Sequence, residues 1–168
     1  MVKEKIDNLF FLFYLVLIFW FVFEFYFLDK LAFICPIEYK QDIVIRKDTL
    51  GNGKFASPRN GRRLHNGIDL LAPTGTLVRA VKSGEVINAE FNKGLGNYIE
   101  IMHPDGLVSI YGHLNTIEVK RGQYVQQAAV LGTVGKTGNA DHPRILPHLH
   151  FELRKNNIPQ DPFSGYLK

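Results

Sequence analysis

Short runs rich in Val, Ile, Leu and Tyr recur from residue 76 onward, and glycine-bearing turns separate them. The runs are TLVRAV, GEVINAEF, NYIEIMH, LVSIYGHL, IEVKRG, VLGTVG and HLHFEL. β-branched and aromatic residues favour strands, and such runs joined by glycine-bearing turns are typical of antiparallel sheets. None of them shows a helical period over ten residues. The pattern predicts an all-β domain, built as an antiparallel sandwich or a partly open barrel.

The N-terminal region has a different composition. An uncharged run of apolar and aromatic residues begins at Leu9, is interrupted by Glu24, and continues to Leu28. Twenty helical residues span about 30 Å, which is the thickness of the hydrocarbon core of a bilayer. We therefore expect one transmembrane helix over residues 9–28. A cleavable signal peptide is the alternative, but the following LAFIC offers no small-x-small cleavage site, so an uncleaved anchor is favoured.

These signals divide the chain into a membrane anchor over residues 1–30, a short tether over 31–47 and one domain over 48–168. The tether would reach at most about 60 Å when fully extended, which predicts a domain held close to its membrane. Lysine and arginine residues lie on both sides of the apolar run, so their count does not orient the helix. The chain has one cysteine, Cys35, and an intramolecular disulfide is therefore excluded.

The segment PHLHFEL, near the C-terminus, places two histidines one residue apart. In a strand, successive side chains point to opposite faces, so His148, His150 and Glu152 share one face. The residues between them, Leu149, Phe151 and Leu153, share the other. Two imidazoles at a fixed spacing suit one metal ion, or one ligand and one proton carrier. A pair of surface histidines is the alternative interpretation.

A second segment, HNGIDL, can bring an imidazole and a carboxylate together. In an extended chain His65, Gly67 and Asp69 line one face. A two-residue hairpin turn at Asn66–Gly67 is the other geometry that we consider, and it also places His65 near Asp69. In both cases Gly67 leaves room between the two side chains.

Together with one histidine of the H-x-H pair, His65 and Asp69 make a set of two imidazoles and one carboxylate. Such a set leaves one tetrahedral position for water, as in catalytic zinc sites. A structural site rich in thiolates is excluded by the single cysteine. Other divalent ions, including non-heme iron, stay open as alternatives.

The chain resembles the lysostaphin/LytM-type zinc metallopeptidases, which cut peptides of the bacterial cell wall. The resemblance covers roughly residues 48–162 and rests on four segments in the order and approximate spacing of that family. They are PRNGRRLHNGIDLLAPTGTLVRAVKSGEV, GLGNYIEIMHPDGLVSIYGHL, VKRGQYVQQAAVLGTVGKTGN and PHLHFELRKNNIPQDP. The resemblance also implies a β fold with the zinc in a groove across the sheet.

Residue by residue, the resemblance implies that His65, Asp69 and His150 bind one Zn²⁺. It further implies that His113, of YGHL, and His148 lie beside the metal as catalytic groups. We assign His148 as the general base, since an imidazole of ordinary pKa near 6.5 accepts and returns protons at neutral pH. His113 would then donate a hydrogen bond to the tetrahedral oxyanion. The sequence leaves the exchange of these two roles open.

Three functions are compatible with this pattern. The first is a zinc endopeptidase acting on peptidoglycan. The second is a non-catalytic wall-binding module or an activator of wall amidases, which degenerate members of the resembled family become after losing ligands. The third is a metalloenzyme of another β class such as a cupin, but a cupin does not account for H-x-x-x-D and YGHL together.

Other conspicuous residues have ordinary interpretations. His103 is next to Pro104–Gly106, a predicted hairpin turn. His142 lies in a loop that is longer than the one we associate with the family, and this loop could shape a substrate groove. Tyr111 alternates with His113, so it faces either the site or the core. Arg59 belongs to a basic cluster with Arg62 and Arg63. We consider three roles: Arg59 stabilises an oxyanion, the cluster binds substrate carboxylates, or these side chains form a solvated surface.

The resemblance and the charges predict location and partners. From Leu31 onward there are 17 basic and 12 acidic residues, and a mildly positive domain favours an anionic wall polymer. Basic residues are not interleaved with aromatic ones, which excludes nucleic acid as a partner. We expect a single-pass protein of the bacterial cytoplasmic membrane with its catalytic domain on the periplasmic or extracellular side. The expected partners are peptidoglycan peptides, the membrane and a protein regulator of the cell envelope.

Overall fold

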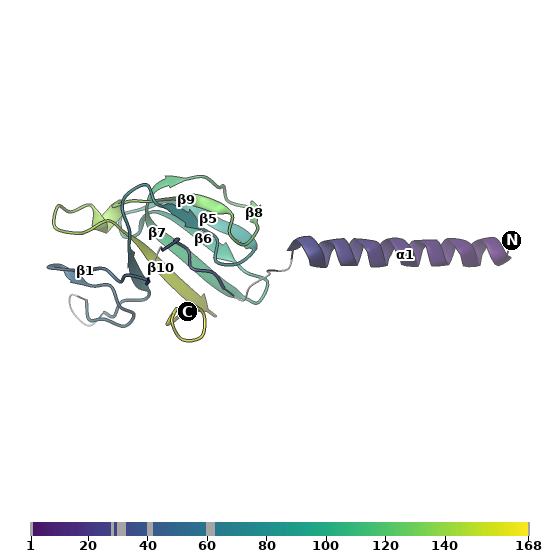
Figure 1. The fold of residues 1–168 in the computed structure, drawn as a ribbon, viewed down its shortest axis with the longest axis horizontal. Helices are drawn as coiled ribbons and strands as arrows, with labels where there is room; N and C mark the ends of the chain where they lie inside the picture. Colours follow the sequence, from purple (N-terminus) through teal and green to yellow (C-terminus); the bar gives the residue numbers. More distant parts are fainter. Residues whose placement is uncertain (1, 28, 30–32, 40–41, 60–62, 168) are drawn as a thin grey trace. The chain divides into compact units, whose positions relative to one another are not determined.

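The computed structural model describes residues 2–27, 29, 33–39, 42–59 and 63–167 (Figure 1). The chain forms two compact units, Met1–Lys30 and Leu31–Lys168. The first unit is helical and the second is built from strands.

The N-terminal unit contains the helix α1, Val2–Phe27. The sequence predicts a transmembrane helix over residues 9–28, and Leu28 lies outside the described residues. A helix is present in this region, but the described part of the chain contains no helix that is long and apolar enough to cross a membrane. The predicted membrane anchor, and the membrane as a partner, are therefore not supported.

The second unit consists of a nine-stranded sheet and a two-stranded sheet. The strands are β1 (Lys47–Asp48), β2 (Gly51–Asn52), β3 (Ile68–Leu71), β4 (Leu77–Arg79), β5 (Gly84–Asn92), β6 (Gly96–Met102), β7 (Leu107–Ile117), β8 (Tyr124–Val125), β9 (Val130–Val134), β10 (His148–Lys155) and β11 (Ile158–Gln160), and η1 (Gly138–Ala140) is a short 3₁₀ turn. The large sheet runs in the order β11-β10-β7-β6-β5-β8, while β3 pairs with β10 and β9 pairs with β4 and β7. All pairings are antiparallel. The predicted antiparallel β architecture is confirmed, and the described strands do not close into a barrel.

β10 shows how the alternating sequence builds the core. Leu149, Phe151 and Leu153 are fully buried in the main apolar cluster, and burial of each such side chain contributes about 1.5–3 kcal/mol. The opposite face carries His148, His150 and Glu152, as the sequence predicts. These polar side chains are also buried, with exposed fractions of 2%, 7% and 4%. The strand is therefore covered on both faces, and its polar face needs hydrogen-bond partners.

A bulge in β7 changes the direction of one important side chain. Ile99 of β6 pairs with Tyr111, but Asn97 pairs with Leu114, so β7 contains one extra residue between the two pairs. His113 lies in this bulge and has a left-handed backbone conformation, with φ of +61°. Regular alternation would point His113 to the same face as Tyr111, which is in the core. The bulge instead allows His113 to face the polar side of the sheet.

Residues 31–47 are predicted to form a tether, but the described part of this segment, 33–39 and 42–47, packs on the domain. Ile37 is 1% exposed and belongs to the core. The main chain of Ile34 donates to the carbonyl of Val81, and Pro36 accepts from Arg79. Two apolar side chains of the segment, Phe33 and Ile37, thus replace solvent contact with core contact. The compact unit accordingly begins at Leu31.

Candidate metal centre

A cavity of about 470 Å³ opens on the polar side of β10. Four of the six histidines in the chain line it, namely His65, His113, His148 and His150. Asp69, Glu152, Arg46 and Arg154 also contribute to its walls, and residues within 50–59, 63–66, 92–95 and 139–145 supply the rest. The cavity therefore collects most of the imidazoles of the chain in one place.

Three side chains present donor atoms to a common point. His65 Nε2 lies 3.1 Å from His150 Nδ1 and 3.1 Å from Asp69 Oδ1. His150 Nδ1 lies 2.9 Å from the same carboxylate oxygen. All three residues are buried. The predicted set of two imidazoles and one carboxylate is therefore brought together in space.

Strand pairing explains this convergence. His150 of β10 and Asp69 of β3 are directly opposite each other in the antiparallel ladder, where side chains on one face are neighbours. The segment before β3 allows His65 to reach the same point. Gly67 makes this approach possible, because a Cβ at this position would lie 2.2 Å from the carbonyl oxygen of Phe151. Asn66–Gly67 is a bend before a strand, so the alternative two-residue hairpin is wrong.

The geometry of the three donors fits a zinc ion. Zinc bonds of 2.0–2.1 Å in a tetrahedral site place neighbouring donors roughly 3.3 Å apart, close to the 2.9–3.1 Å between these atoms. The electrostatics agree with the geometry. Burial lowers the pKa of His150, but hydrogen bonds from its ring to Asp69 and Glu152 outweigh burial and raise the pKa to about 9. A positive charge is thus favoured beside Asp69 and Glu152.

Main-chain carbonyl groups fix the orientation of three imidazoles. His65 Nδ1 lies 2.9 Å from the oxygen of Lys54, and His113 Nδ1 lies 2.9 Å from that of Thr137. His148 Nδ1 lies 2.7 Å from the oxygen of Leu146. A carbonyl only accepts, so each Nδ1 carries the hydrogen and each Nε2 is left with its lone pair. This orientation is that of a metal ligand or a proton acceptor.

His150 is oriented in the opposite sense. Its Nε2 lies 2.9 Å from Glu152 Oε1, so Nδ1 is the atom that faces Asp69. Arg154 Nε donates to the other oxygen of Glu152 at 2.8 Å. Carboxylates behind a ligating imidazole are common in metal sites, where they set its tautomer and orientation.

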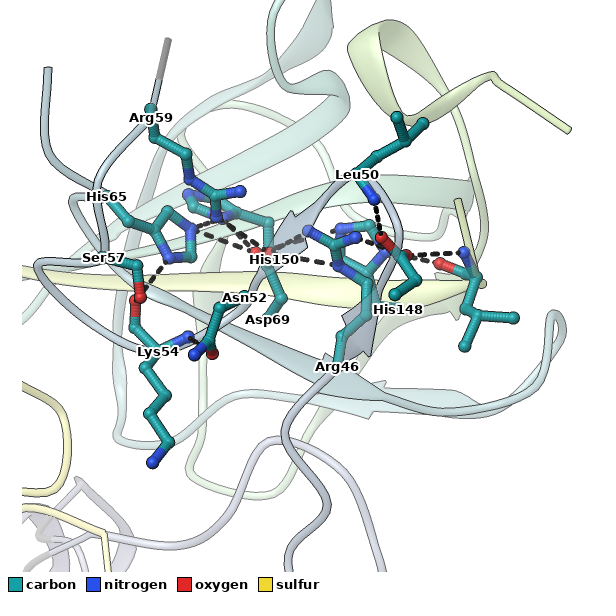
Figure 2. A network of polar contacts seen from close by, with 12 residues as sticks. Arg46, Leu50, Asn52, Lys54, Ser57, Arg59, His65, Asp69, His148 and His150 are labelled. Atoms are coloured by element: carbon teal, nitrogen blue, oxygen red, sulfur yellow. Dashed lines mark hydrogen bonds and ion pairs between the residues drawn. The ribbon is translucent and has the colours of Figure 1, made fainter. Parts of the chain in front are cut away.

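The two carboxylate oxygens of Asp69 have different partners. Oδ1 faces the histidines, while Oδ2 accepts hydrogen bonds from Arg46 Nη2 at 2.9 Å and from Arg59 Nη2 at 3.1 Å. Figure 2 shows both arginines converging on Asp69. Burial raises the pKa of Asp69, but the hydrogen bond from His150 and the positive charge on that ring hold this pKa well below its usual range. Asp69 is therefore ionised throughout the neutral range.

His113 and His148 form a pair beside the three donors. Their ring centroids are 4.9 Å apart, and His148 Nε2 lies 3.8 Å from Asp69 Oδ1. Burial, with the nearby His150, lowers the pKa of His113 to about 3. Burial also lowers the pKa of His148, to about 4. Both imidazoles are neutral at neutral pH, and a neutral imidazole can accept a proton.

Three further residues singled out in the sequence lie outside the cavity lining, namely Tyr111, His103 and His142. Tyr111 is fully buried in the core and its hydroxyl accepts from the Val81 main chain at 3.0 Å, so it does not line the cavity. His103 is buried away from the site, with its ring between the Ser83 carbonyl and the Ser109 hydroxyl. His142 does not line the cavity either, although its loop supplies Ile145 to the wall.

The basic cluster is only partly described, because Arg62 lies outside the described residues. Arg59 reaches the site, but it binds Asp69 instead of pointing freely to a substrate. Arg63 lines the cavity. Sequence reasoning missed Arg46 as a site residue, since it lies 23 positions before its partner Asp69. It also missed the contact of Glu152 with His150, although the spacing of the two in H-x-E already placed them on one face.

A buried centre of two imidazoles and one carboxylate, with two neutral imidazoles beside it, has the donor set found in catalytic zinc sites of hydrolases. The sequence pattern of Peptidase family M23 matches residues 63–162. The chain belongs to this family. The predicted resemblance to lysostaphin/LytM-type metallopeptidases is therefore confirmed.

Named relatives agree with this assignment. The peptidoglycan DD-endopeptidase ShyC of Vibrio cholerae is 37% identical over 135 residues, which cover 79% of this chain and 29% of ShyC. The catalytic domain of lysostaphin from Staphylococcus simulans is 34% identical with a TM-score of 0.58, and the match covers 67% of this chain and 86% of that domain. A zinc-containing peptidase from Vibrio cholerae is 34% identical with a TM-score of 0.59, covering 85% of this chain and 40% of that protein. This chain spans about a quarter of the length of the curated relatives it matches.

Proposed function

We propose that this chain is a zinc-dependent endopeptidase that hydrolyses peptide bonds in peptidoglycan. The observation that carries the proposal is the convergence of His65, Asp69 and His150 on one point, within a cavity that also holds two neutral imidazoles. Membership of a peptidase family supports the reaction class. The similarity to ShyC, a peptidoglycan DD-endopeptidase, supports the substrate class.

The residues that would hold the ion are His65 through Nε2, Asp69 through Oδ1 and His150 through Nδ1. A bound zinc ion lowers the pKa of its water ligand toward about 7 and polarises a scissile carbonyl. Asp69 and Glu152 supply two negative charges next to His150. These charges favour a cation here and offset the cost of burying it.

His148 is the proton carrier in this proposal. Its Nε2 is within 4 Å of Asp69 Oδ1, so it lies next to the place where the nucleophilic water would be held. The hydrogen bond to Leu146 keeps the hydrogen on Nδ1 and leaves Nε2 free to accept a proton. His148 takes the proton of the water and later delivers it to the leaving amine.

His113 has the same orientation as His148, because its Nδ1 donates to the Thr137 carbonyl. Its Nε2 is therefore a proton acceptor in the resting domain. It becomes a hydrogen-bond donor to an oxyanion only after it has gained a proton. Both imidazoles are therefore candidate bases in this proposal, and we assign the base to His148 because of its proximity to Asp69.

The location follows from the substrate. Peptidoglycan lies outside the cytoplasmic membrane, so the proposal places the domain on the periplasmic or extracellular side of a bacterial cell. Fractionation of cells with protease accessibility of the domain would test this location. Degradation of the domain only after lysis of spheroplasts, and not in intact spheroplasts, would contradict it.

The alternative is a non-catalytic wall-binding or amidase-activating module. The complete set of donors and both flanking histidines favour the peptidase. The test is incubation of the purified chain with peptidoglycan, with zinc, with a chelator and as His150→Ala. Release of new amino termini that is lost in both controls supports the proposal. A zinc-loaded chain that binds peptidoglycan without cleaving it supports the alternative.

A further inference from the structure

A strap formed by residues 44–53 lies against β3 beside Asp69. The main-chain nitrogen of Arg46 donates to the carbonyl of Asp69 at 2.8 Å, and the nitrogen of Asp69 donates to Gly53 at 2.8 Å. Arg46 and Gly53 are joined by a third bond of 2.8 Å. Both main-chain groups of Asp69 are therefore fixed by the strap, on the side of β3 opposite its partner β10.

The side chain of Arg46 extends this support to the carboxylate. It is 4% exposed, and its Nη2 and Nε lie 2.9 Å and 3.3 Å from Asp69 Oδ2. Its Nη1 pairs with Asp48 Oδ2 at 2.5 Å. A planar guanidinium fixes the direction of a carboxylate more closely than an ammonium group does. With Oδ2 held in this way, Oδ1 is directed to the histidines.

Asp48 continues the network toward His148. Its Oδ2 accepts a hydrogen bond from the main-chain nitrogen of Leu146 at 3.2 Å. The carbonyl of Leu146 in turn accepts from His148 Nδ1 at 2.7 Å. This path begins at Asp69, passes through Arg46, Asp48 and Leu146, and ends at His148. Figure 2 labels Asp69, Arg46 and His148 along it.

The energetics suggest a role beyond stability. Burying an arginine and two carboxylates costs several kcal/mol per ion in desolvation, and apolar residues of similar volume often stabilise a fold equally well. Arg46 and Asp48 lie before the matched region, residues 63–162. Neither side chain belongs to the three donors or to the two flanking imidazoles.

We propose that Arg46 and Asp48 are positioning residues, through which the strap orients Asp69 toward the metal and His148 toward the substrate. The inference rests on the proposed function and deepens it. By orienting Asp69, Arg46 raises the affinity of the three donors for the metal. Asp48 holds Leu146 and through it orients His148, the proton carrier. The two residues act as one unit because they share an ion pair.

The test uses the full chain with Arg46→Gln, Asp48→Ala and the double variant. Arg79→Gln is the matched control. Arg79 also forms an ion pair with a residue that precedes β1, Glu38, but neither of the two lines the cavity. Zinc affinity is measured without substrate, by competition with a chromophoric chelator. Values of kcat and KM are then measured on a peptidoglycan peptide at saturating zinc.

Arg46→Gln is expected to weaken zinc binding by about 10–100-fold, the range seen for residues that orient metal ligands. Asp48→Ala is expected to lower kcat by about tenfold or more at unchanged KM, because it loosens His148. In each measurement, zinc affinity and kcat, the loss in the double variant should be smaller than the combined losses of the two single variants. Residues of one network usually show such non-additivity. Arg79→Gln should leave zinc affinity and kcat unchanged.

Wild-type zinc affinity in Arg46→Gln, or wild-type kcat in Asp48→Ala, would overturn the inference. If either variant fails to fold, Arg46→Lys and Asp48→Asn replace it, and retention of full zinc affinity by Arg46→Lys would have the same meaning. The proposed function fails separately, when the wild-type chain binds zinc but cleaves no wall peptide. In that case zinc affinity still reports on Arg46.

Discussion

His65 Nε2 lies 3.1 Å from His150 Nδ1, although 85 positions separate the two residues in the sequence. The contact depends on β3 and β10 lying side by side, with Asp69 directly opposite His150. The convergence of the three donor atoms thus depends on this strand pairing and on the segment that leads into β3. Changes to that pairing should affect metal binding before they affect the rest of the fold.

Replacing the flanking histidines should separate catalysis from metal binding. We expect His148→Ala and His113→Ala to keep zinc, because neither residue supplies one of the three converging donors. Each should lower kcat by about 10²–10⁴-fold, the usual value of a positioned acid or base. Metal content and kcat measured on the same preparations provide the check. A larger loss in His113→Ala than in His148→Ala would show that the two roles are exchanged.

Removing the carboxylate behind His150 should weaken the centre. Glu152→Ala leaves His150 Nε2 without its acceptor and is expected to reduce zinc affinity about 10–100-fold. Glu152→Gln keeps an oxygen acceptor of the same shape and should lose less. Competition titrations of both variants test this order. Equal affinities for the two variants and the wild type would mean that Glu152 does not orient the ligand.

A methyl group at Gly67 should separate β3 from β10. The new Cβ would meet the Phe151 carbonyl at 2.2 Å, and overpacking of this kind typically costs about 1–3 kcal/mol of stability. Gly94→Ala is a suitable control, because the nearest atom to its new Cβ would be Asn92 Oδ1, at 3.3 Å. Chemical denaturation of the two variants gives the comparison. Unchanged stability in Gly67→Ala would contradict the close approach of these strands.

Acid should destabilise the metal-free domain through His113. Burial lowers the pKa of His113 to about 3, whereas the ordinary value of about 6.5 applies to the unfolded chain. Below pH 6.5 the unfolded chain therefore binds a proton that the folded domain does not, and the stability of the fold falls as the pH decreases toward 3. Removing the imidazole in His113→Gln should reduce this loss. Denaturation of chelator-treated protein at pH 7 and pH 5 tests the sign, and an equal pH dependence in both proteins would refute it.

The sequence predicts much of this centre because the relevant patterns are local. Alternation in PHLHFEL separates the buried Leu149 and Phe151 from the polar His148 and His150, and the structure has this arrangement. The short runs between glycine-bearing turns likewise predict an antiparallel sheet, which the pairings confirm.

Other features depend on contacts that no local pattern contains. Alternation allowed Tyr111 and His113 to face the site together, but one extra residue in β7 turns His113 toward the cavity while Tyr111 stays in the core. The support of Asp69 by Arg46 depends on the folding of a preceding strap. Packing of the same kind holds the described residues of the predicted tether, 33–39 and 42–47, on the domain.

We propose that His65, Asp69 and His150 hold a zinc ion that makes this chain a peptidoglycan endopeptidase. The most direct measurement is the release of new amino termini from purified peptidoglycan by the zinc-loaded chain, with His150→Ala as the matched control. The account predicts cleavage by the wild-type chain and a loss of at least about 10³-fold in the control, since the metal contributes several kcal/mol to catalysis. Equal cleavage by both proteins, or a zinc-loaded wild-type chain without cleavage, would contradict it.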